Sequence, residues 1–335
     1  MSSFLLRHLL ESTFFCLLLS GIAICLRRGA TARYAVLLMG IGKFAIPTVV
    51  LTSTGEQMAS LWPAARWLAL VTYKLSVLFG AIQNAFPVRR DIEIFSVWLV
   101  GSVAMLTLWA IRWRRSRPIL AAATPSEEAA LRHAQQLLPV YGKVKLRRSN
   151  VEIEPALRGI FRPVITIPQG LSDRLTPAEL AGVLLHELAH ARRFDNLTGA
   201  FVHALLCLFW FHPLLWMVEK RLNIERERAC DETVIACGLR PQVYAAGILK
   251  VCRFQLFDSA APGISTMSGG DLKSRLSLIL DVPASASLLF VPWLLIVALT
   301  IFMTLVPVAG GYCAQCAQSS VECKAPASCA QKVIQ

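Results

Sequence analysis

The chain carries a short histidine–glutamate motif whose spacing suits metal chemistry. Residues 186–190 read His-Glu-Leu-Ala-His, so His186 and His190 are four positions apart and lie on one face of a helix. Two imidazoles in that arrangement can bind one metal ion, and Glu187 lies beside them to act on a metal-bound water. The motif therefore predicts a metal-dependent hydrolase.

A second acidic motif further along the chain can complete the ligand set. Glu227 is followed one helical turn later by Asp231. We expect Glu227 to supply the third ligand and Asp231 to orient a histidine ring. Two imidazoles and one carboxylate leave a fourth position open for water, which favours a single Zn²⁺ ion.

The alternative interpretation is an amphipathic helix whose two histidines face solvent by chance. Apolar residues flank the motif on both sides, so we expect the helix to be buried, and buried ionisable groups need partners. The segment that contains Glu227 offers those partners. We therefore expect peptide-bond hydrolysis, in which Glu187 acts as general base towards a water whose pKa the zinc lowers.

The boundaries of the motif helix can be predicted from its first residues. Thr176-Pro177-Ala178-Glu179 is a capping box with proline at the first helical position, which predicts a helix from Pro177 to about Arg193. Short strands are expected before it, and a strand edge beside such a helix can hold an extended substrate by strand addition. The expected strands are 144–148, 151–153 and 164–167.

The composition indicates a membrane protein. Of 335 residues, 55% are hydrophobic and only 16% are charged, whereas about a quarter are charged in soluble domains. The net charge of +13 could suggest nucleic acid as a partner. Because the arginines cluster at the ends of apolar runs, membrane topology explains them better, and we expect no direct nucleic-acid binding.

Four apolar runs are long enough to span a bilayer. They cover about 9–26, 34–52, 94–111 and 288–309. A cleaved signal peptide is the alternative for the first run, but its basic cluster follows the apolar residues instead of preceding them.

The arginine clusters set the expected orientation. Clusters at 27–33 and 112–117 both lie in the cytoplasm if the amino terminus is outside. A further apolar run, 67–86, is interpreted as an interfacial helix on the outer side, because a fifth crossing would separate the two clusters. The expected parts are a membrane domain (1–117), a cytoplasmic zinc domain (118–284), a last span (288–309) and an extracytoplasmic tail (310–335).

The apolar run 197–218 cannot be an ordinary span if Glu227 is a ligand. As one helix it would extend roughly 33 Å and cross the bilayer. Residues 219–226 would then have to return as extended backbone in lipid, where polar groups find no partners. His212-Pro213 supplies a break, so we predict a helical hairpin that dips into the membrane surface.

Taken together, these motifs resemble the BlaR/MecR-type integral membrane metallopeptidases over about residues 1–310. The resemblance implies a mainly α membrane protein with a cytoplasmic α+β, gluzincin-like domain inserted before the last span. It implies His186, His190 and Glu227 as zinc ligands, Glu187 as general base and Asp231 as partner of a ligand, whereas Asp195 and Arg226 match the pattern without a role that we can assign. The segments that carry the resemblance are 43–47, 161–165, 167–168, 184–195, 209–216 and 225–232.

The resemblance also implies a purpose. Known members sense an extracellular signal, activate the zinc domain and cause cleavage of a transcriptional repressor. We therefore expect a signal-transducing endopeptidase of the bacterial cytoplasmic membrane, with a protein substrate and the lipid bilayer as partners and a homodimer as a candidate assembly. In the antibiotic sensors a penicillin-binding domain follows the last span. The residues after Ala309 contain no Ser-x-x-Lys acylation motif, so direct sensing of β-lactams is not expected.

The expected tail contains four cysteines that could form a small zinc knuckle or two disulfides. Outside the cytoplasm disulfides are favoured, with three connectivities open. These cysteines are Cys313, Cys316, Cys323 and Cys329.

Two other functional classes compete with regulated proteolysis. One is a quality-control protease of the Ste24 type, which would differ in having a broad range of substrates. The other is a non-catalytic membrane receptor or scaffold, against which the intact ligand set and Glu187 both argue.

Overall fold

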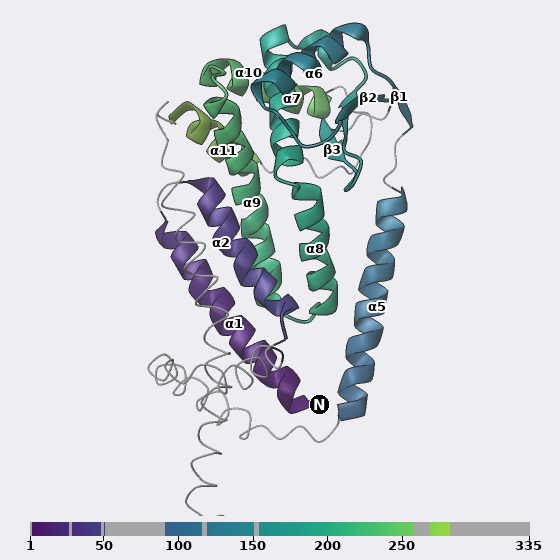
Figure 1. The fold of residues 1–335 in the computed structure, drawn as a ribbon, viewed down its shortest axis with the longest axis vertical. Coiled ribbons are helices and arrows are strands. Elements are labelled where there is room, and N and C mark those ends of the chain that lie inside the picture. Colours follow the sequence, from purple (N-terminus) through teal and green to yellow (C-terminus); the bar gives the residue numbers. More distant parts are fainter. Residues whose placement is uncertain are drawn as a thin grey trace, which may run out of the picture.

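The computed structural model describes residues 2–26, 29–47, 50, 91–115, 119–150, 154–257 and 269–281. This part of the chain is mostly helical and contains one small mixed sheet (Figure 1). Several helices lie side by side along the length of the molecule, and the sheet lies at one end of this array. The helices of the array are α1 (Ser2–Cys25), α2 (Ala30–Gly42), α5 (Asp91–Arg115), α8 (Asp195–Leu208) and α9 (Pro213–Ala236).

The sheet has the strand order β1-β2-β4-β3, with β2 and β4 parallel and the outer pairs antiparallel. The strands are β1 (Leu120–Ala122), β2 (Lys145–Ser149), β3 (Ala156–Arg158) and β4 (Val164–Pro168). β2 and β4 match two predicted strands, and the third, at 151–153, lies outside the described residues. The sequence missed β1 and β3 because three residues are too few to show an alternating pattern.

The sheet end also contains four helices, α6 (Pro125–Leu137), α7 (Pro177–Arg192), α10 (Pro241–Phe257) and α11 (Gly269–Asp281), and the 3₁₀ turn η3 (Ser172–Arg174). α7 has the bounds and the capping box that the sequence predicts, with both reciprocal hydrogen bonds between Thr176 and Glu179 present. Around α7 lies an apolar core that includes Leu184, Leu188 and Ile165, each 0% exposed.

A second apolar core lies between α1, α2, α8 and α9. It includes Phe15 and Leu206, and α9 contributes Leu215 and Leu222 from its first half. Further along α9, Val234 belongs to the core of the sheet end. α9 therefore belongs to both parts of the molecule.

Two described helical segments are long and apolar enough to cross a membrane, Leu5–Cys25 in α1 and Ile92–Arg115 in α5. They overlap the predicted spans at 9–26 and 94–111. The predicted span at 288–309 and the predicted interfacial helix at 67–86 lie outside the described residues, so the number of spans stays a prediction.

The sequence predicted a membrane span over 34–52, but the described part of this run is not a single helix. α2 begins at Ala30 and ends at Gly42, where the short 3₁₀ turn η1 (Lys43–Ala45) follows. Ile46 is extended, with φ −105° and ψ 104°, because the next residue is Pro47 and a residue before proline avoids the helical region.

The run 197–218 is divided into two helices. α8 ends at Leu208 and α9 begins at Pro213, so the break occurs at the predicted His212-Pro213. α9 then continues without interruption through Glu227, so the return path is a helix and not an extended segment (Figure 1). The position of this hairpin relative to a bilayer stays a prediction.

α5 packs against the turn of this hairpin through polar and aromatic contacts. The indole nitrogen of Trp98 donates to the carbonyl oxygen of Leu208 at 2.7 Å, which satisfies a carbonyl at the end of α8. Gly101 faces Trp210 so closely that a Cβ on Gly101 would overlap the indole ring. The absence of a side chain at Gly101 thus lets α5 approach the turn.

We expect Gly101→Ala to destabilise the protein although alanine is the better helix former. The added methyl group would push Trp210 away and cost about 1–3 kcal/mol. The matched control is Gly21→Ala in α1, where the Cβ would meet nothing within 4 Å, and we expect it to stabilise by about 0.5–1 kcal/mol. Unfolding of the detergent-solubilised protein, followed by tryptophan fluorescence, measures both; equal effects of the two substitutions would contradict the close packing.

Candidate metal centre

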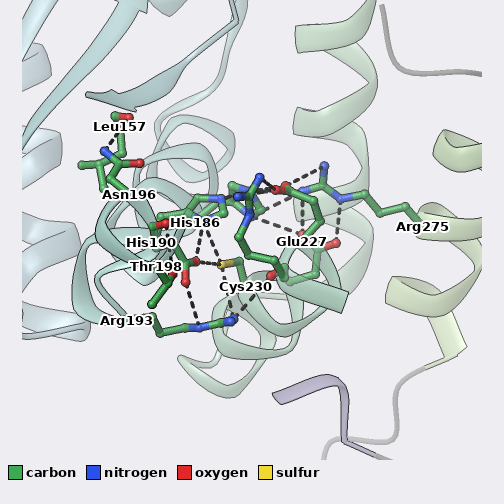
Figure 2. Close-up of polar contacts among 12 residues, drawn as sticks. Leu157, His186, His190, Arg193, Asn196, Thr198, Glu227, Cys230 and Arg275 are labelled. Atoms are coloured by element: carbon green, nitrogen blue, oxygen red, sulfur yellow. Dashed lines mark hydrogen bonds and ion pairs between the residues drawn. The ribbon is translucent and has the colours of Figure 1, made fainter. Parts of the chain in front are cut away.

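α7 and α9 bring the two predicted motifs together. The Nε2 atoms of His186 and His190 are 3.2 Å apart, and Glu227 Oε2 lies 3.3 Å from Nε2 of His186 (Figure 2). Glu227 Oε1 lies 3.8 Å from Nε2 of His190. One ligand atom from each of the three residues lies within 4.8 Å of the other two.

These distances suit a tetrahedral zinc ion. With bonds of about 2.0–2.1 Å, two ligand atoms of such an ion are separated by roughly 3.4 Å. Two imidazole nitrogens and one carboxylate are also the donor set of catalytic zinc sites, where the fourth position takes water. The three residues therefore fit the ion that the sequence predicts.

The charges around the histidines favour a cation between the ligand atoms. Burial alone would lower the pKa of His186, but hydrogen bonds with the carboxylates of Asp231 and Glu227 raise this pKa to about 9. Burial likewise raises the pKa of Glu227, yet the hydrogen bond from His186 and the charges of both histidines hold it well below its usual value. A divalent cation would satisfy the same need for positive charge.

His190 is oriented by Asp195, the residue to which the sequence assigned no role. The Nδ1–H of His190 donates to Asp195 Oδ2 at 2.7 Å, which leaves Nε2 for the metal. Asp195 is 2% exposed and opens α8, directly after Phe194, whose φ of +55° turns the chain. Cys230 adds a contact of 3.4 Å to the same Nδ1.

Asp195, His190 and Cys230 also lie close enough together to be considered as metal ligands. The separation of 2.7 Å between His190 Nδ1 and Asp195 Oδ2 is, however, that of a charge-assisted hydrogen bond. We therefore interpret this group as the support of His190 and not as a second metal site.

His186 is oriented through a longer network. Asp231 Oδ1 lies 3.2 Å from its Nδ1, as the sequence predicts, but Tyr244 Oη is nearer at 2.9 Å and donates to Asp231 Oδ1 at 2.6 Å. With Nε2 facing the metal position, Nδ1 carries the proton and donates it to these oxygens. Arg275 completes the network with hydrogen bonds of 2.6 and 2.7 Å to the two oxygens of Asp231 (Figure 2).

Tyr244 and Arg275 were not predicted from the sequence. They come from α10 and α11, and neither helix contains a motif that points to the site. Arg226, for which the sequence predicted no role, lies next to the metal position, with its Nη2 at 3.4 Å from Glu227 Oε1.

Glu187, the predicted general base, is buried beside the two histidines. It is 6% exposed and lines the same cavity as His186 and His190. Burial raises the pKa of its carboxyl group above the usual value, despite the opposing charges of the two histidines and a hydrogen bond from the backbone of Leu157. A raised pKa makes the carboxylate a better proton acceptor.

The cavity over the site has a volume of about 750 Å³ and is lined from six elements. β3, α7 and α8 contribute Leu157, Glu187 and Asn196, and α9, α10 and α11 contribute Asn223, Ile248 and Arg275. A cavity of this size accommodates several residues of a polypeptide. The tail cysteines Cys313, Cys316, Cys323 and Cys329 lie outside the described residues.

Comparisons with a family model and with individual proteins point to the same family. A family model described as BlaR1 peptidase M56 matches residues 3–279. The regulatory protein BlaR1 of Bacillus licheniformis is 31% identical over 159 residues, which are 46% of this chain and 26% of that protein. The methicillin resistance mecR1 protein of Staphylococcus aureus is 22% identical over 193 residues, 56% of this chain and 33% of that protein. The chain thus covers a third or less of the length of these relatives.

We expect Glu227→Gln to abolish stoichiometric zinc binding, because the amide lacks the charge that the metal position requires. Zinc per protein, measured by mass spectrometry after dialysis against a weak chelator, should fall from one to near zero. The matched control is Glu219→Gln, two turns earlier on α9 and outside the ligand group, which should keep its zinc. A full complement of zinc in the Glu227→Gln protein would exclude it as a ligand.

Asp195→Asn should weaken zinc binding without removing it. The amide keeps the size of the side chain but loses the charge that fixes the His190 ring, and changes of this kind cost about 10–100-fold in metal affinity or activity. Competition with a fluorescent chelator measures the affinity. Asp173→Asn, at an exposed position in η3, serves as control. An unchanged affinity in both variants would mean that Asp195 does not orient the ligand.

Proposed function

Because the chain belongs to the BlaR1 peptidase M56 family, we propose that it is a membrane-bound, zinc-dependent endopeptidase that cleaves a cytoplasmic regulatory protein. The observation that carries this proposal is the approach of His186, His190 and Glu227 within 4.8 Å, with the buried Glu187 on the same cavity. We assign the first three as zinc ligands and Glu187 as general base.

A zinc ion held by His186, His190 and Glu227 would act as a Lewis acid and would lower the pKa of a bound water molecule. Glu187 would take a proton from the attacking water while the water oxygen bonds to the peptide carbonyl carbon. The same carboxyl group then delivers the proton to the amide nitrogen as the C–N bond breaks. Asp195 and Asp231 hold the two histidine rings in place during these steps.

The outer edge of β3 is suited to binding an extended substrate. β3 ends the sheet in the described part of the chain, and its residues line the cavity beside Glu187. An extended polypeptide can add to such an edge by main-chain hydrogen bonds, which places its peptide bonds next to the zinc and requires no free terminus. This geometry favours an endopeptidase.

The positions of the arginines support a cytoplasmic zinc domain. α5 ends with Arg112, Arg114 and Arg115 at the end of the array where the sheet lies, and α1 ends and α2 begins there too (Figure 1). Arg33, near the start of α2, is thus on the same side as the arginines of α5. Because positive residues mark the cytoplasmic side, residues 118–284 would form a cytoplasmic domain next to the membrane domain of 1–117.

The names of the relatives support a regulatory purpose. One is a regulatory protein and the other a methicillin resistance protein. We therefore propose that the substrate is a cytoplasmic regulator such as a transcriptional repressor, and that the bacterial cytoplasmic membrane is the site of action. If the protein instead cleaves many membrane proteins, its function is quality control and not regulation.

We expect Glu187→Gln to lower cleavage at least 100-fold while zinc stays bound, because the general base contributes about 10²–10⁴-fold and is not a ligand. Comparison of new amino termini in the proteomes of cells with the wild type and with this variant measures cleavage. One cleaved transcription factor would support regulation. Hundreds of cleaved membrane proteins would contradict it, and identical proteomes would contradict catalysis altogether.

A further inference from the structure

The substrate edge of β3 is already occupied by side chains of the protein itself. In the β3–β4 register, Leu157 lies opposite Ile165. The carbonyl oxygen of Leu157 accepts a hydrogen bond from the side chain of Asn196 on α8, so this residue faces away from β4 and towards the cavity. In a strand the N–H and C=O of one residue point to the same side, and the N–H of Leu157 therefore also faces the open edge.

The carbonyl oxygen of Leu157 is bound by Asn196. The side-chain amide nitrogen of Asn196 donates to the carbonyl oxygen of Leu157 at 3.1 Å (Figure 2). It also donates to the carbonyl oxygen of Gly159 at 2.8 Å. Asn196 is the second residue of α8 and itself lines the cavity. Its two hydrogen bonds run along the edge where a substrate strand would place its own N–H groups.

We propose that Asn196 is a gate on the substrate edge: its amide takes the place of a substrate N–H and must leave Leu157 and Gly159 before an extended polypeptide can pair with β3. This inference rests on the proposed function, and it adds a residue that controls access of the substrate to the zinc.

The gate can open without disturbing the metal position. Asn196 is half-buried, so its released amide can bind water. The preceding residue, Asp195, stays hydrogen-bonded to His190 at 2.7 Å and holds the start of α8. Rotation of the Asn196 side chain alone therefore frees the two carbonyl oxygens.

A structural role for Asn196 predicts the opposite result. If the amide served only to brace β3 against α8, its removal would loosen the edge and weaken binding of a polypeptide. If it competes with the substrate, its removal tightens binding, because an intramolecular hydrogen bond no longer has to be displaced. Net contributions of such bonds correspond to about a three- to tenfold change in affinity.

The experiment measures binding separately from catalysis. The full chain carries Glu187→Gln to prevent cleavage and is held in lipid nanodiscs with zinc. The probe is fluorescein-labelled β-casein, an unfolded polypeptide, whose binding is followed by anisotropy. Asn196→Ala is the main variant. Asn196→Ser is a second variant, in case Asn196→Ala does not fold, because the serine hydroxyl is too short to reach both carbonyl oxygens. The control is Gln135→Ala on α6, which removes a side-chain amide that donates to the backbone carbonyl oxygen of Val144, away from the cavity.

We expect both Asn196 variants to bind casein about three- to tenfold more tightly and the Gln135 variant to bind within twofold of the parent. Unchanged or weaker binding in both Asn196 variants, at an unchanged zinc content, would overturn the gate. So would the absence of casein binding in every variant. Cleavage by the protein that retains Glu187 tests the proposed function independently, so the two ideas can fail separately.

Discussion

The reversal of the chain between α8 and α9 is the constraint on which the rest of the structure depends. A third ligand from one helix must reach two histidines on another, and an apolar run long enough to cross a bilayer separates them in sequence. The chain turns at His212-Pro213, and α9 then extends as one helix to Glu227. A straight helix over the whole run would separate the ligands by the thickness of a membrane.

This arrangement also connects the metal position to the helices predicted to lie in the membrane. Where α9 packs against α2, Glu225 is 0% exposed and its carboxylate binds Arg33 at 2.7 Å. Glu232 accepts the backbone N–H of Ala30 at 2.9 and 3.1 Å, at the first residue of α2. Glu227 lies between these two residues in sequence, so α2 is bound to the segment that carries the ligand on both sides of it.

Much of the fold and of the metal position could be predicted from the sequence, because these features depend on local patterns or on a single geometric requirement. The capping box gave the start of α7, and the spacing of His186 and His190 gave their common face. The break at His212-Pro213 followed from the need to return Glu227 to the histidines. The span predicted at 34–52 is not a single helix, because α2 ends at Gly42 and the backbone is extended at Ile46, before Pro47. β3 was missed since three residues carry no detectable period.

A comparison of the two histidines explains why part of the site could not be predicted from the sequence. His190 depends on Asp195, five residues later, so its support is encoded next to the motif. His186 depends on Asp231, Tyr244 and Arg275, which come from α9, α10 and α11 and meet only in the folded domain. A buried carboxylate such as Asp231 needs a cation and a donor, but the sequence does not say which of 34 basic residues supplies the charge. One ligand can therefore be aligned as soon as α7 and α8 have formed, whereas the other requires the whole domain up to α11. The metal position is complete only when α11 has docked.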